Sequence, residues 1–504
     1  MIERLMKKSK GLWLIIILSV FVFAACTTNE DQIEYEENDD AVNEIEEDDY
    51  EEISDDVEGD EDEEAADESD EDRALFVPSW FSLTTVTAGE RDMILEDLDY
   101  LAEIMLENAP TLGVFERRFD ITMEDALADM RYGIYNLEVS DHNTTEEKDR
   151  EAAANNLYRL LVWFEEMVER MGHFGPLWSG TYIDQLEMVL AREHQSEIID
   201  NRVVIDGEDF GDAERLQGFI DDLTSEATLL FYDVELDDLD LYRDLTEIGW
   251  EIEGNVTTEI IEEDRIAYFQ IDSFIGNPTF DSEVLFPFFE EVQDFEHLII
   301  DLRGNTGGWP VYFEQYVMAM LIDSPVEARF NEFFTSGAAT REEIEHSLEW
   351  PITGRTTKAD EILLADDFVN EEALPYFNEA DLEILTYMIP WHIEIEPRED
   401  NTPFAGEIWL LVDNWSGSAS EFAAMKSIYS GFATVVGVPT RRVTPVQTLQ
   451  ISLPNTGIMF RIDIGYLIDD LGRSLEEYGV IPDIVTEANR DALNVVLDLI
   501  EEQY

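Results

Sequence analysis

Apolar side chains recur every three or four positions in the first part of the chain that has a mixed composition. Two such series lie within residues 90–172, one beginning at Met93 and the other at Leu157. This period lines one face of a helix with apolar groups, so the pattern predicts a helical region over residues 75–180. Residues 181–262 follow no single period, and we assign them to a small mixed or β-rich module.

From residue 263 to the last residue, 504, the pattern changes to short apolar runs that alternate with helical stretches. Strands are predicted at 266–271, 297–302, 408–412 and 433–436, with helices at 284–292, 311–322 and 419–429. Alternating strands and helices predict an α/β core. The stretch from about 325 to 404 contains several helical runs and interrupts this core, so we interpret it as a helical insertion or cap.

The N-terminal residues have the pattern of an export signal. A basic start is followed by an apolar run over Leu12–Phe23 and then by Ala24-Ala25-Cys26. The run is too short to cross about 30 Å of hydrocarbon comfortably, and small residues precede a cleavage point. Residues 1–25 resemble a bacterial lipoprotein signal peptide. That resemblance implies lipidation of Cys26 and attachment to the extracytoplasmic face of the cell membrane.

The next segment, residues 26–74, is dominated by carboxylates. Between Glu30 and Asp72 there are 27 acidic residues among 43, and there is no Lys or Arg. Such a segment cannot bury enough apolar surface to offset the entropy lost on ordering. We therefore predict a disordered, self-repelling tether between the lipid and the folded part.

Charge and cysteine content exclude several classes of protein. The formal net charge is −88, and residues 73–504 still carry 90 acidic against 26 basic residues. This balance excludes ordinary electrostatic binding to nucleic acid, whose phosphates would be repelled. A single Cys excludes a disulfide scaffold and a cysteine-rich metal site. The sequence calls for no metal and no organic cofactor.

Two loops carry the candidate chemistry. The first, Asp301–Gly308, follows a strand and is rich in glycine, which lets backbone N–H groups approach a ligand. The second, Ser416–Glu421, also lies between a strand and a helix. Ser418 and Glu421 have the spacing of a capping box, so Ser418 is either an N-cap or a nucleophile. In the second case the N–H of Ala419 would point at a developing oxyanion.

Together the two loops resemble the C-terminal processing, or tail-specific, serine peptidase family. That family pairs a D-L-R-x-N-x-G-G loop with an S-A-x-E helix start, and both motifs occur here in that order. The resemblance spans about residues 264–490, with a histidine region upstream. It implies a core related to the Clp protease and crotonase folds. The matching positions are Asp301, Leu302, Arg303, Asn305, Gly307, Gly308, Ser418, Ala419, Glu421, Gly437, Thr440 and Gly479–Asp483.

The general base departs from the commoner pattern of the family. Many members place a lysine 25 residues after the serine, and that position here is Val443. Lys426 lies about two helical turns beyond Ser418, too far to reach its hydroxyl. A branch typified by tricorn protease uses a histidine from an upstream helical region instead. His173, which closes a helical run, occupies the corresponding place, although the flanking residues differ from that branch.

The resemblance also implies the rest of the site. The tricorn-like branch orients its histidine with a glutamate shortly before a G-V-x-P-D stretch, which selects Glu476, with Glu477 as the fallback. The oxyanion would be held by the N–H of Ala419 and by one from Gly307 or Gly308. The implied protein is an exported, lipid-anchored serine endopeptidase acting on exported or unfolded polypeptides.

The sequence leaves three questions open. A catalytically inactive peptide- or ligand-binding lipoprotein on the same fold is the main alternative, because the usual lysine is missing. Many members of the family carry a PDZ module for tail recognition, and no carboxylate-binding loop is evident in residues 180–262. The oligomeric state has no sequence signature.

Overall fold

A computed structural model describes residues 77–503, apart from 82–83, 142–143, 169–171, 206–207, 237–238, 240, 242–250, 350–354, 357–361, 372–373, 445 and 488–489. The predicted signal peptide, Cys26 and the acidic tether therefore lie outside the described residues. Within the described part, no helix has the length and apolar character needed to span a bilayer.

The core is a six-stranded sheet in the order β19-β15-β14-β9-β8-β7, parallel except for β7. Every residue of β9 is buried, as expected for a parallel strand covered on both faces. The strands are β7 (Val256–Glu262), β8 (Ile266–Ile271), β9 (His297–Asp301), β14 (Glu407–Val412), β15 (Thr434–Gly437) and β19 (Ile484–Val485). This arrangement agrees with the predicted α/β core.

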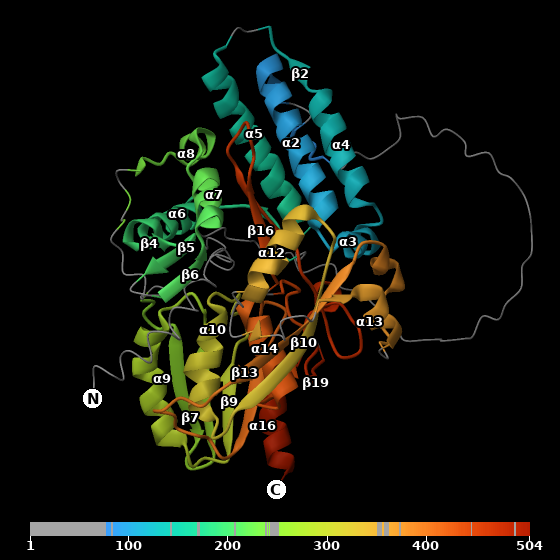
Figure 1. Cartoon of the computed structure of the whole chain (residues 1–504). Helices are drawn as coiled ribbons and strands as arrows, with labels where there is room; N and C mark the ends of the chain where they lie inside the picture. The colour runs from blue at the N-terminus through green and yellow to red at the C-terminus, as the bar shows by residue number, and fades with distance from the viewer. Residues whose placement is uncertain are drawn as a thin grey trace, which may run out of the picture.

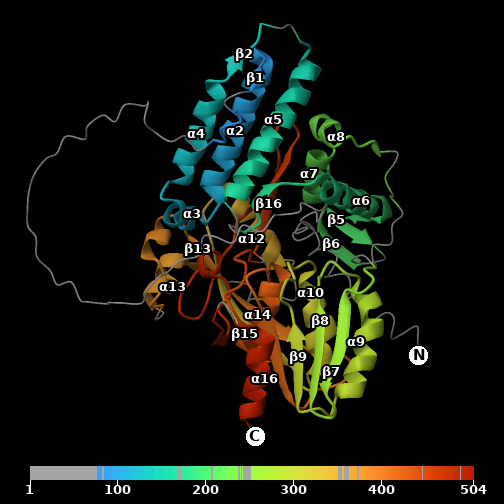
Figure 2. The ribbon, with the colours of Figure 1, turned by 180° about the vertical axis from the view of Figure 1, so that it is seen from behind.

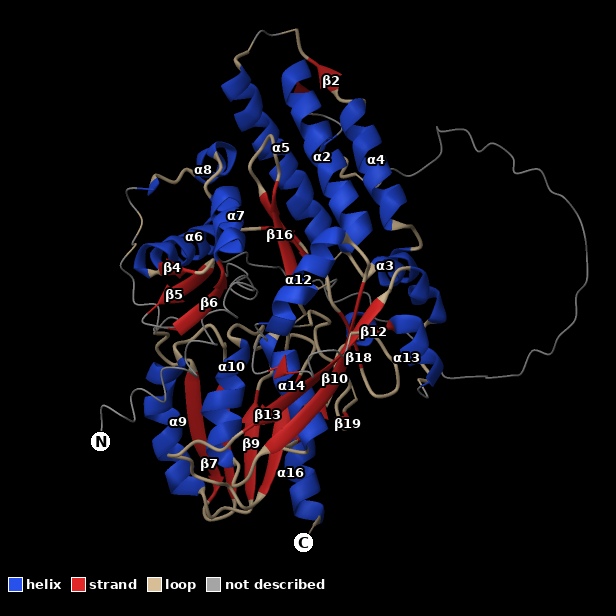
Figure 3. Ribbon diagram, viewed as in Figure 1, coloured by secondary structure: helices blue, strands red, loops and turns tan. Residues whose placement is uncertain are grey.

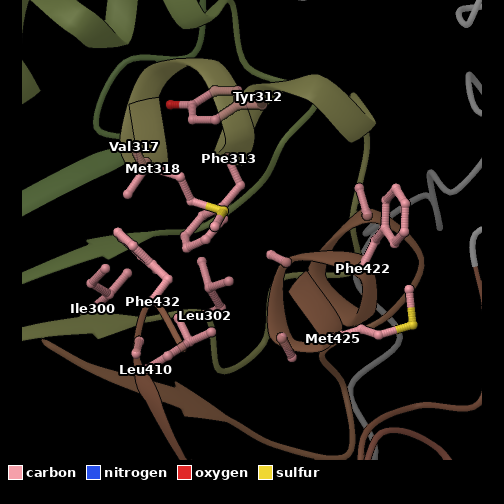
Figure 4. Close-up of a cluster of buried hydrophobic side chains, with 14 of the residues drawn as sticks. Ile300, Leu302, Tyr312, Phe313, Val317, Met318, Leu410, Phe422, Met425 and Phe432 are labelled. Atoms are coloured by element: carbon pink, nitrogen blue, oxygen red, sulfur yellow. The ribbon is translucent and has the colours of Figure 1, made fainter. Parts of the chain in front are cut away.

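Helices cover both faces of this sheet. On one face Ile300, Leu302 and Leu410 lie beside Phe313 and Phe432, in a cluster drawn in Figure 4. On the other face α16 (Ala492–Glu502) packs over the sheet. The helices of the first face are α9 (Pro278–Val292), α10 (Pro310–Phe313), the π-helix η3 (Glu314–Met318), α11 (Ala319–Leu321) and α14 (Ala419–Ser430). Because β9 and β14 are parallel, their carboxyl ends lie at the same edge of the sheet. The two Gly/Ser loops follow these strands and therefore meet at that edge.

One boundary differs from the sequence-based assignment. β7 was placed in the small module of residues 181–262, but it pairs antiparallel with β8 along its whole length. Figure 2 shows β7, β8 and β9 side by side. The described part of the module consists of α6 (Ser179–Gln195), β4 (Glu197–Ile199), β5 (Arg202–Ile205), β6 (Glu208–Asp212), α7 (Ala213–Leu223) and α8 (Glu226–Tyr232).

Long helices form the N-terminal region, at the top of Figure 1. They are α2 (Ala88–Asn108), α4 (Met123–Tyr135) and α5 (Glu146–Met167), with the shorter α3 (Leu112–Phe119) below them in the picture and a short parallel pair β1 (Thr85–Val86) and β2 (Glu138–Val139). Thr87 and Glu90 form a capping box that starts α2. α5 runs down toward the core, so its C-terminal end brings the following segment to the active-site level.

The insertion is built on a sheet rather than on helices alone. Its two nine-residue strands, β10 (Val326–Phe334) and β13 (Tyr387–Ile395), pair along their whole length and cross the middle of the molecule in Figure 3. Apolar side chains alternate along both strands and enter the two main hydrophobic cores. This period of two differs from the helical runs predicted from the sequence for the stretch. The other elements are α12 (Ala338–Glu349), β11 (Arg355–Thr356), β12 (Leu363–Leu364), α13 (Ala365–Glu371) and η5 (Glu379–Glu383).

A hairpin joins the helical region to the core. It consists of β16 (Thr448–Ser452) and β17 (Met459–Asp463), with the short β3 (Gly175–Pro176) paired to β17. Asp97 of α2 accepts hydrogen bonds from the backbone N–H groups of Asn455 and Thr456, both at 2.8 Å, which ties the hairpin turn to the helices. β18 (Tyr466–Ile468), α15 (Leu475–Tyr478) and β19 then complete the chain before α16.

Candidate active site

Ser418 occupies a strained turn between β14 and α14. Its backbone has φ +52° and ψ −119°, a conformation that non-glycine residues rarely adopt and that is often retained at functional sites. Although it stands at the N-cap position, its side chain makes no capping hydrogen bond. The capping interpretation therefore does not account for this serine, and its hydroxyl is directed to another partner.

That partner is His173. The His173 Nε2 atom lies 3.0 Å from Ser418 Oγ, although the two residues are 245 positions apart. Both side chains are buried. The distance is within the range in which an imidazole removes a hydroxyl proton. The structure thus brings together the two residues that the motifs selected, and it does so through the fold alone.

Strand pairing explains why the ring lies there. β3 pairs antiparallel with β17 so that Gly175 faces Arg461. Extending this register by two residues sets His173 opposite Asp463. The His173 N–H donates to Asp463 Oδ2 at 2.6 Å, and Nδ1 lies 3.2 Å from Oδ1. Asp463 therefore holds both the backbone and the ring of the histidine.

This geometry corrects the prediction that Glu476 orients the histidine, because Asp463 occupies that place. Glu476 lies in α15 with its oxygens occupied by other donors: Oε1 accepts from Thr444 Oγ1 at 2.5 Å, and Oε2 accepts from Ser474 Oγ at 2.9 Å. Burial raises the pKa of Glu476 to about 8, so this group is largely uncharged near neutral pH. An uncharged carboxyl cannot stabilise an imidazolium in the way that a carboxylate does.

The fallback, Glu477, is turned to the other side of α15. It forms an ion pair with Arg117 of α3 at 2.8 Å. The family spacing could not reveal Asp463, because its role depends on the pairing of β3 with β17. A local signal was available nevertheless. Met459–Asp463 is an apolar run interrupted by two charged residues, and a charge on a buried strand calls for a partner.

The two Gly/Ser loops face each other across Asn305. Its backbone oxygen accepts from Gly417 N at 3.1 Å, and its side-chain Oδ1 accepts from Ser420 Oγ at 2.7 Å. The same Oδ1 also accepts the N–H of Gly307 at 2.8 Å. Because Asn305 itself is completely buried, these bonds set the distance between the first loop and the nucleophile turn.

These contacts separate the two candidates for the second oxyanion donor. The N–H of Gly307 is already used by Asn305, whereas those of Gly308 and Ala419 donate to no protein acceptor in the described part of the chain. Gly307 serves in a different way. A Cβ there would lie 2.8 Å from Ser418 Cβ, so only glycine lets the two loops approach this closely. The geometry favours Ala419 and Gly308 as the pair of donors.

Glu421, the last residue of the second motif, holds a neighbouring segment over the nucleophile turn. Its Oε1 accepts from Thr440 Oγ1 at 2.5 Å and from the N–H of Arg442 at 2.7 Å. Burial raises the pKa of Glu421 to about 7. Val443, at the position of the usual family lysine, accepts the N–H of Ser418 at 2.7 Å through its carbonyl. We call residues 440–443 the active-site strap.

Lys426 is excluded as a base by its surroundings as well as by its distance along α14. Its ammonium forms a buried ion pair with Glu314 at 2.6 Å and lies 4.0 Å from the centre of the Phe422 ring. Because the Lys426 amine is directed to Glu314, it is not available to the Ser418 hydroxyl. In the described residues, no group of three or more His, Cys, Asp or Glu side chains is arranged to hold a metal ion.

Ser418 has no exposed surface in this structure, and His173 is only 2% exposed. A polypeptide therefore reaches the hydroxyl only after a local opening beside the nucleophile turn. The serine, the histidine and the aspartate are nevertheless already hydrogen-bonded in this structure. A local opening would therefore only have to admit the substrate and would not have to rearrange these three side chains.

Comparison with known proteins gives the following matches. The model of peptidase family S41 matches residues 265–486. Mature CPAF is 13% identical, with 82% of this chain and 96% of that chain covered at a TM-score of 0.43. The photosystem II D1 C-terminal processing protease is 14% identical, with 80% and 94% covered at a TM-score of 0.35. A lipoprotein from Streptococcus agalactiae is 12% identical, with 73% and 100% covered at 0.32. No curated protein sequence matches.

Proposed function

Because residues 265–486 of this chain belong to peptidase family S41, we propose that the protein is a serine endopeptidase that hydrolyses exported or unfolded polypeptides through an acyl-enzyme. One observation carries this proposal. Ser418 Oγ lies 3.0 Å from His173 Nε2, and the other ring nitrogen lies 3.2 Å from the Asp463 carboxylate. A hydroxyl, an imidazole and a carboxylate in this order form the hydrogen-bonded series that activates a serine.

The residues act in the following sequence. His173 removes the Ser418 proton as the oxygen attacks the peptide carbonyl carbon. The N–H groups of Ala419 and Gly308 hold the oxyanion, and each such donor contributes about 10²–10³-fold to the rate. His173 then gives the proton to the leaving amine. Water, deprotonated by the same imidazole, hydrolyses the ester and releases Ser418. Asp463 keeps the ring in the tautomer that this exchange requires.

A fluorophosphonate probe tests this proposal directly. We expect the full-length protein to be labelled at Ser418, identified by mass spectrometry of the modified peptide, because the small probe reacts with an activated hydroxyl beside an oxyanion site once the local opening admits it. His173→Ala is expected to slow labelling by about 10²–10⁴-fold. Wild-type protein that remains unlabelled over hours, while a known serine hydrolase reacts in the same tube, would indicate an inactive binding protein on this fold.

The cleavage is proposed to be tail-specific, as the motif resemblance implies, with the C-terminal region of a polypeptide as the preferred target. We assign no PDZ role to the module of residues 181–255. A pocket of about 350 Å³ in its described part has two carboxylates, Glu193 and Glu214, and no Lys or Arg in its lining, so it would repel a substrate's terminal carboxylate.

The proposed location is the extracytoplasmic face of the cell membrane, with a lipid on Cys26. The support is the basic, apolar and small-residue order of residues 1–26. We expect the wild-type protein to sediment with membranes and to dissolve in detergent, and Cys26→Ser to appear in the soluble or uncleaved fraction. If Cys26→Ser sediments as wild type does, after processing to the same size, the lipid anchor is wrong.

A further inference from the structure

Arg441 and Arg442 of the active-site strap stand out among the arginines of this acidic chain. Many other arginines in the described part have a carboxylate partner at close range, as Arg303 has in Asp301 at 2.6 Å and Arg473 has in Asp469 at 2.6 Å. In the same part of the chain, no carboxylate lies within salt-bridge distance of either strap arginine. Both are partly exposed. With 90 acidic residues in the folded part, leaving two adjacent guanidinium groups without a counter-charge requires a reason.

The position of Arg441 supplies that reason. Its N–H donates to Ser416 O at 2.9 Å, which fixes the strap beside the nucleophile turn. Its side chain crosses Gly417, because a Cβ at Gly417 would lie 3.1 Å from Arg441 Cδ. The guanidinium carbon lies 5.4 Å from the centre of the Trp415 ring, a cation–π contact. The stem of the Arg441 side chain therefore lies against Gly417, which precedes Ser418, and its guanidinium lies against Trp415.

Two further features indicate that this cation is prepared for a ligand. Trp415 is 49% exposed, although a large aromatic side chain is normally buried, and it supports the guanidinium from one side. The Nε atom of Arg441 is buried without a hydrogen-bond partner among the described residues. A guanidinium presents its N–H groups as a planar fork that matches a carboxylate, and stacking on a ring keeps that fork oriented.

Backbone strain in the strap adds an independent observation. Arg442 has φ +70°, a left-handed conformation that favours glycine. The strain is maintained by Glu421, which accepts the Arg442 N–H at 2.7 Å. Together with the bond from the Arg441 N–H to Ser416 O, this contact holds the backbone of both arginines beside the nucleophile turn.

From these observations we infer that Arg441, stacked on Trp415, determines specificity by binding a carboxylate of the polypeptide close to the scissile bond. The inference rests on the proposed function for its meaning in catalysis. The carboxylate is either the C-terminal α-carboxylate or the side chain of an Asp or Glu. In a protein of net charge −88, such a ligand is repelled by most of the surface, so a local cation is needed to hold it at the site.

Peptide binding tests this inference without depending on turnover. The probes are three fluorescein-labelled decapeptides of alanine, valine and serine: one with a free C-terminal carboxylate, its C-terminal amide, and the amide with one internal Glu. Binding to the full-length Ser418→Ala protein is measured by anisotropy. We expect at least one acidic peptide to bind roughly 10–100-fold more tightly than the neutral amide, as a charge-assisted hydrogen bond would produce. Tighter binding of the free-acid peptide identifies the C-terminal carboxylate as the ligand, and tighter binding of the Glu-containing amide identifies an acidic side chain.

Variants assign the effect to this residue. Arg441→Gln in the Ser418→Ala background is expected to remove the preference, and Arg441→Lys to keep only part of it because a lysine lacks the planar fork. Arg131→Gln is the matched control, since Arg131 is an exposed arginine on α4 paired with Asp99. Equal affinities for the three peptides, no binding of either acidic peptide, or a preference that survives in Arg441→Gln would each overturn the inference.

The outcome is distinguishable from failure of the proposed function. If Ser418 is not labelled by the fluorophosphonate but acidic peptides bind in an Arg441-dependent way, the hydrolase proposal is wrong and the carboxylate site stands. If Ser418 is labelled and Arg441→Gln cleaves the acid and the amide peptides at the wild-type ratio, the carboxylate site is wrong and the hydrolase stands.

Discussion

Replacing Ser418 with alanine is expected to lower peptide hydrolysis by about 10⁴-fold or more, because the attacking oxygen is lost and only binding and the oxyanion donors remain. The fold should persist, since the hydroxyl makes no cap bond to α14. We expect the free energy of unfolding to stay within about 1 kcal/mol of wild type, the net worth of one hydrogen bond. Initial rates on a quenched fluorescent peptide and a thermal melt measure the two quantities.

The matched control for this substitution lies on the same helix. Ser427 donates its hydroxyl to Ala423 O at 2.7 Å, two turns beyond the nucleophile. Ser427→Ala should therefore cleave the peptide at nearly the wild-type rate. Cleavage by Ser418→Ala at the wild-type rate, in a preparation free of other peptidases, would remove Ser418 from the mechanism.

Asp463→Asn is expected to lower kcat by about 10³–10⁴-fold with little change in KM. The reason is that an amide in place of the carboxylate disfavours the tautomer of His173 that accepts the serine proton, and it stabilises the imidazolium less. Asparagine keeps the size of the side chain and can still accept the His173 N–H through its oxygen. Steady-state kinetics on the same peptide, with labelling by the fluorophosphonate probe, measure this loss.

Glu476→Gln is the informative comparison. With its pKa raised to about 8, Glu476 is already mostly uncharged at neutral pH, and glutamine reproduces much of its hydrogen bonding to Thr444. We expect this variant to lose less than about tenfold in kcat at pH 7. A larger loss in Glu476→Gln than in Asp463→Asn would restore the glutamate that the family spacing selected and reject the aspartate.

Much of the core fold could be predicted from local patterns. The apolar runs at 266–271 and 297–302, each followed by a helical stretch, become β8 and β9 with α9 and α10 after them. Such runs are reliable because a parallel strand covered on both faces must be apolar throughout. The insertion was harder to assign. β10 and β13 carry a period of two within a stretch that also contains helices, and which period prevails depends on the partner strand.

The site residues likewise fall into those that local motifs predict and those that depend on tertiary contacts. The nucleophile, the oxyanion loop and the absence of a usable lysine follow from the order and type of residues in the two motifs, which are local in the chain. The choice between Gly307 and Gly308 depends on Asn305, whose side chain takes the first N–H. The choice of the orienting carboxylate depends on β3 pairing with β17.

The sequence by itself determined the α/β core, the serine at a strand-to-helix turn, and the absence of a lysine at the usual family position. These are properties of neighbouring residues, and backbone geometry transmits them over a few positions. Only the tertiary structure decided that the His173 ring meets Ser418 with Asp463, rather than Glu476, on its other side, and that Arg441 lies beside the nucleophile turn with no carboxylate at salt-bridge distance in the described part of the chain. Both facts concern distances between segments far apart in the chain, which strand register and packing set and which no local spacing encodes.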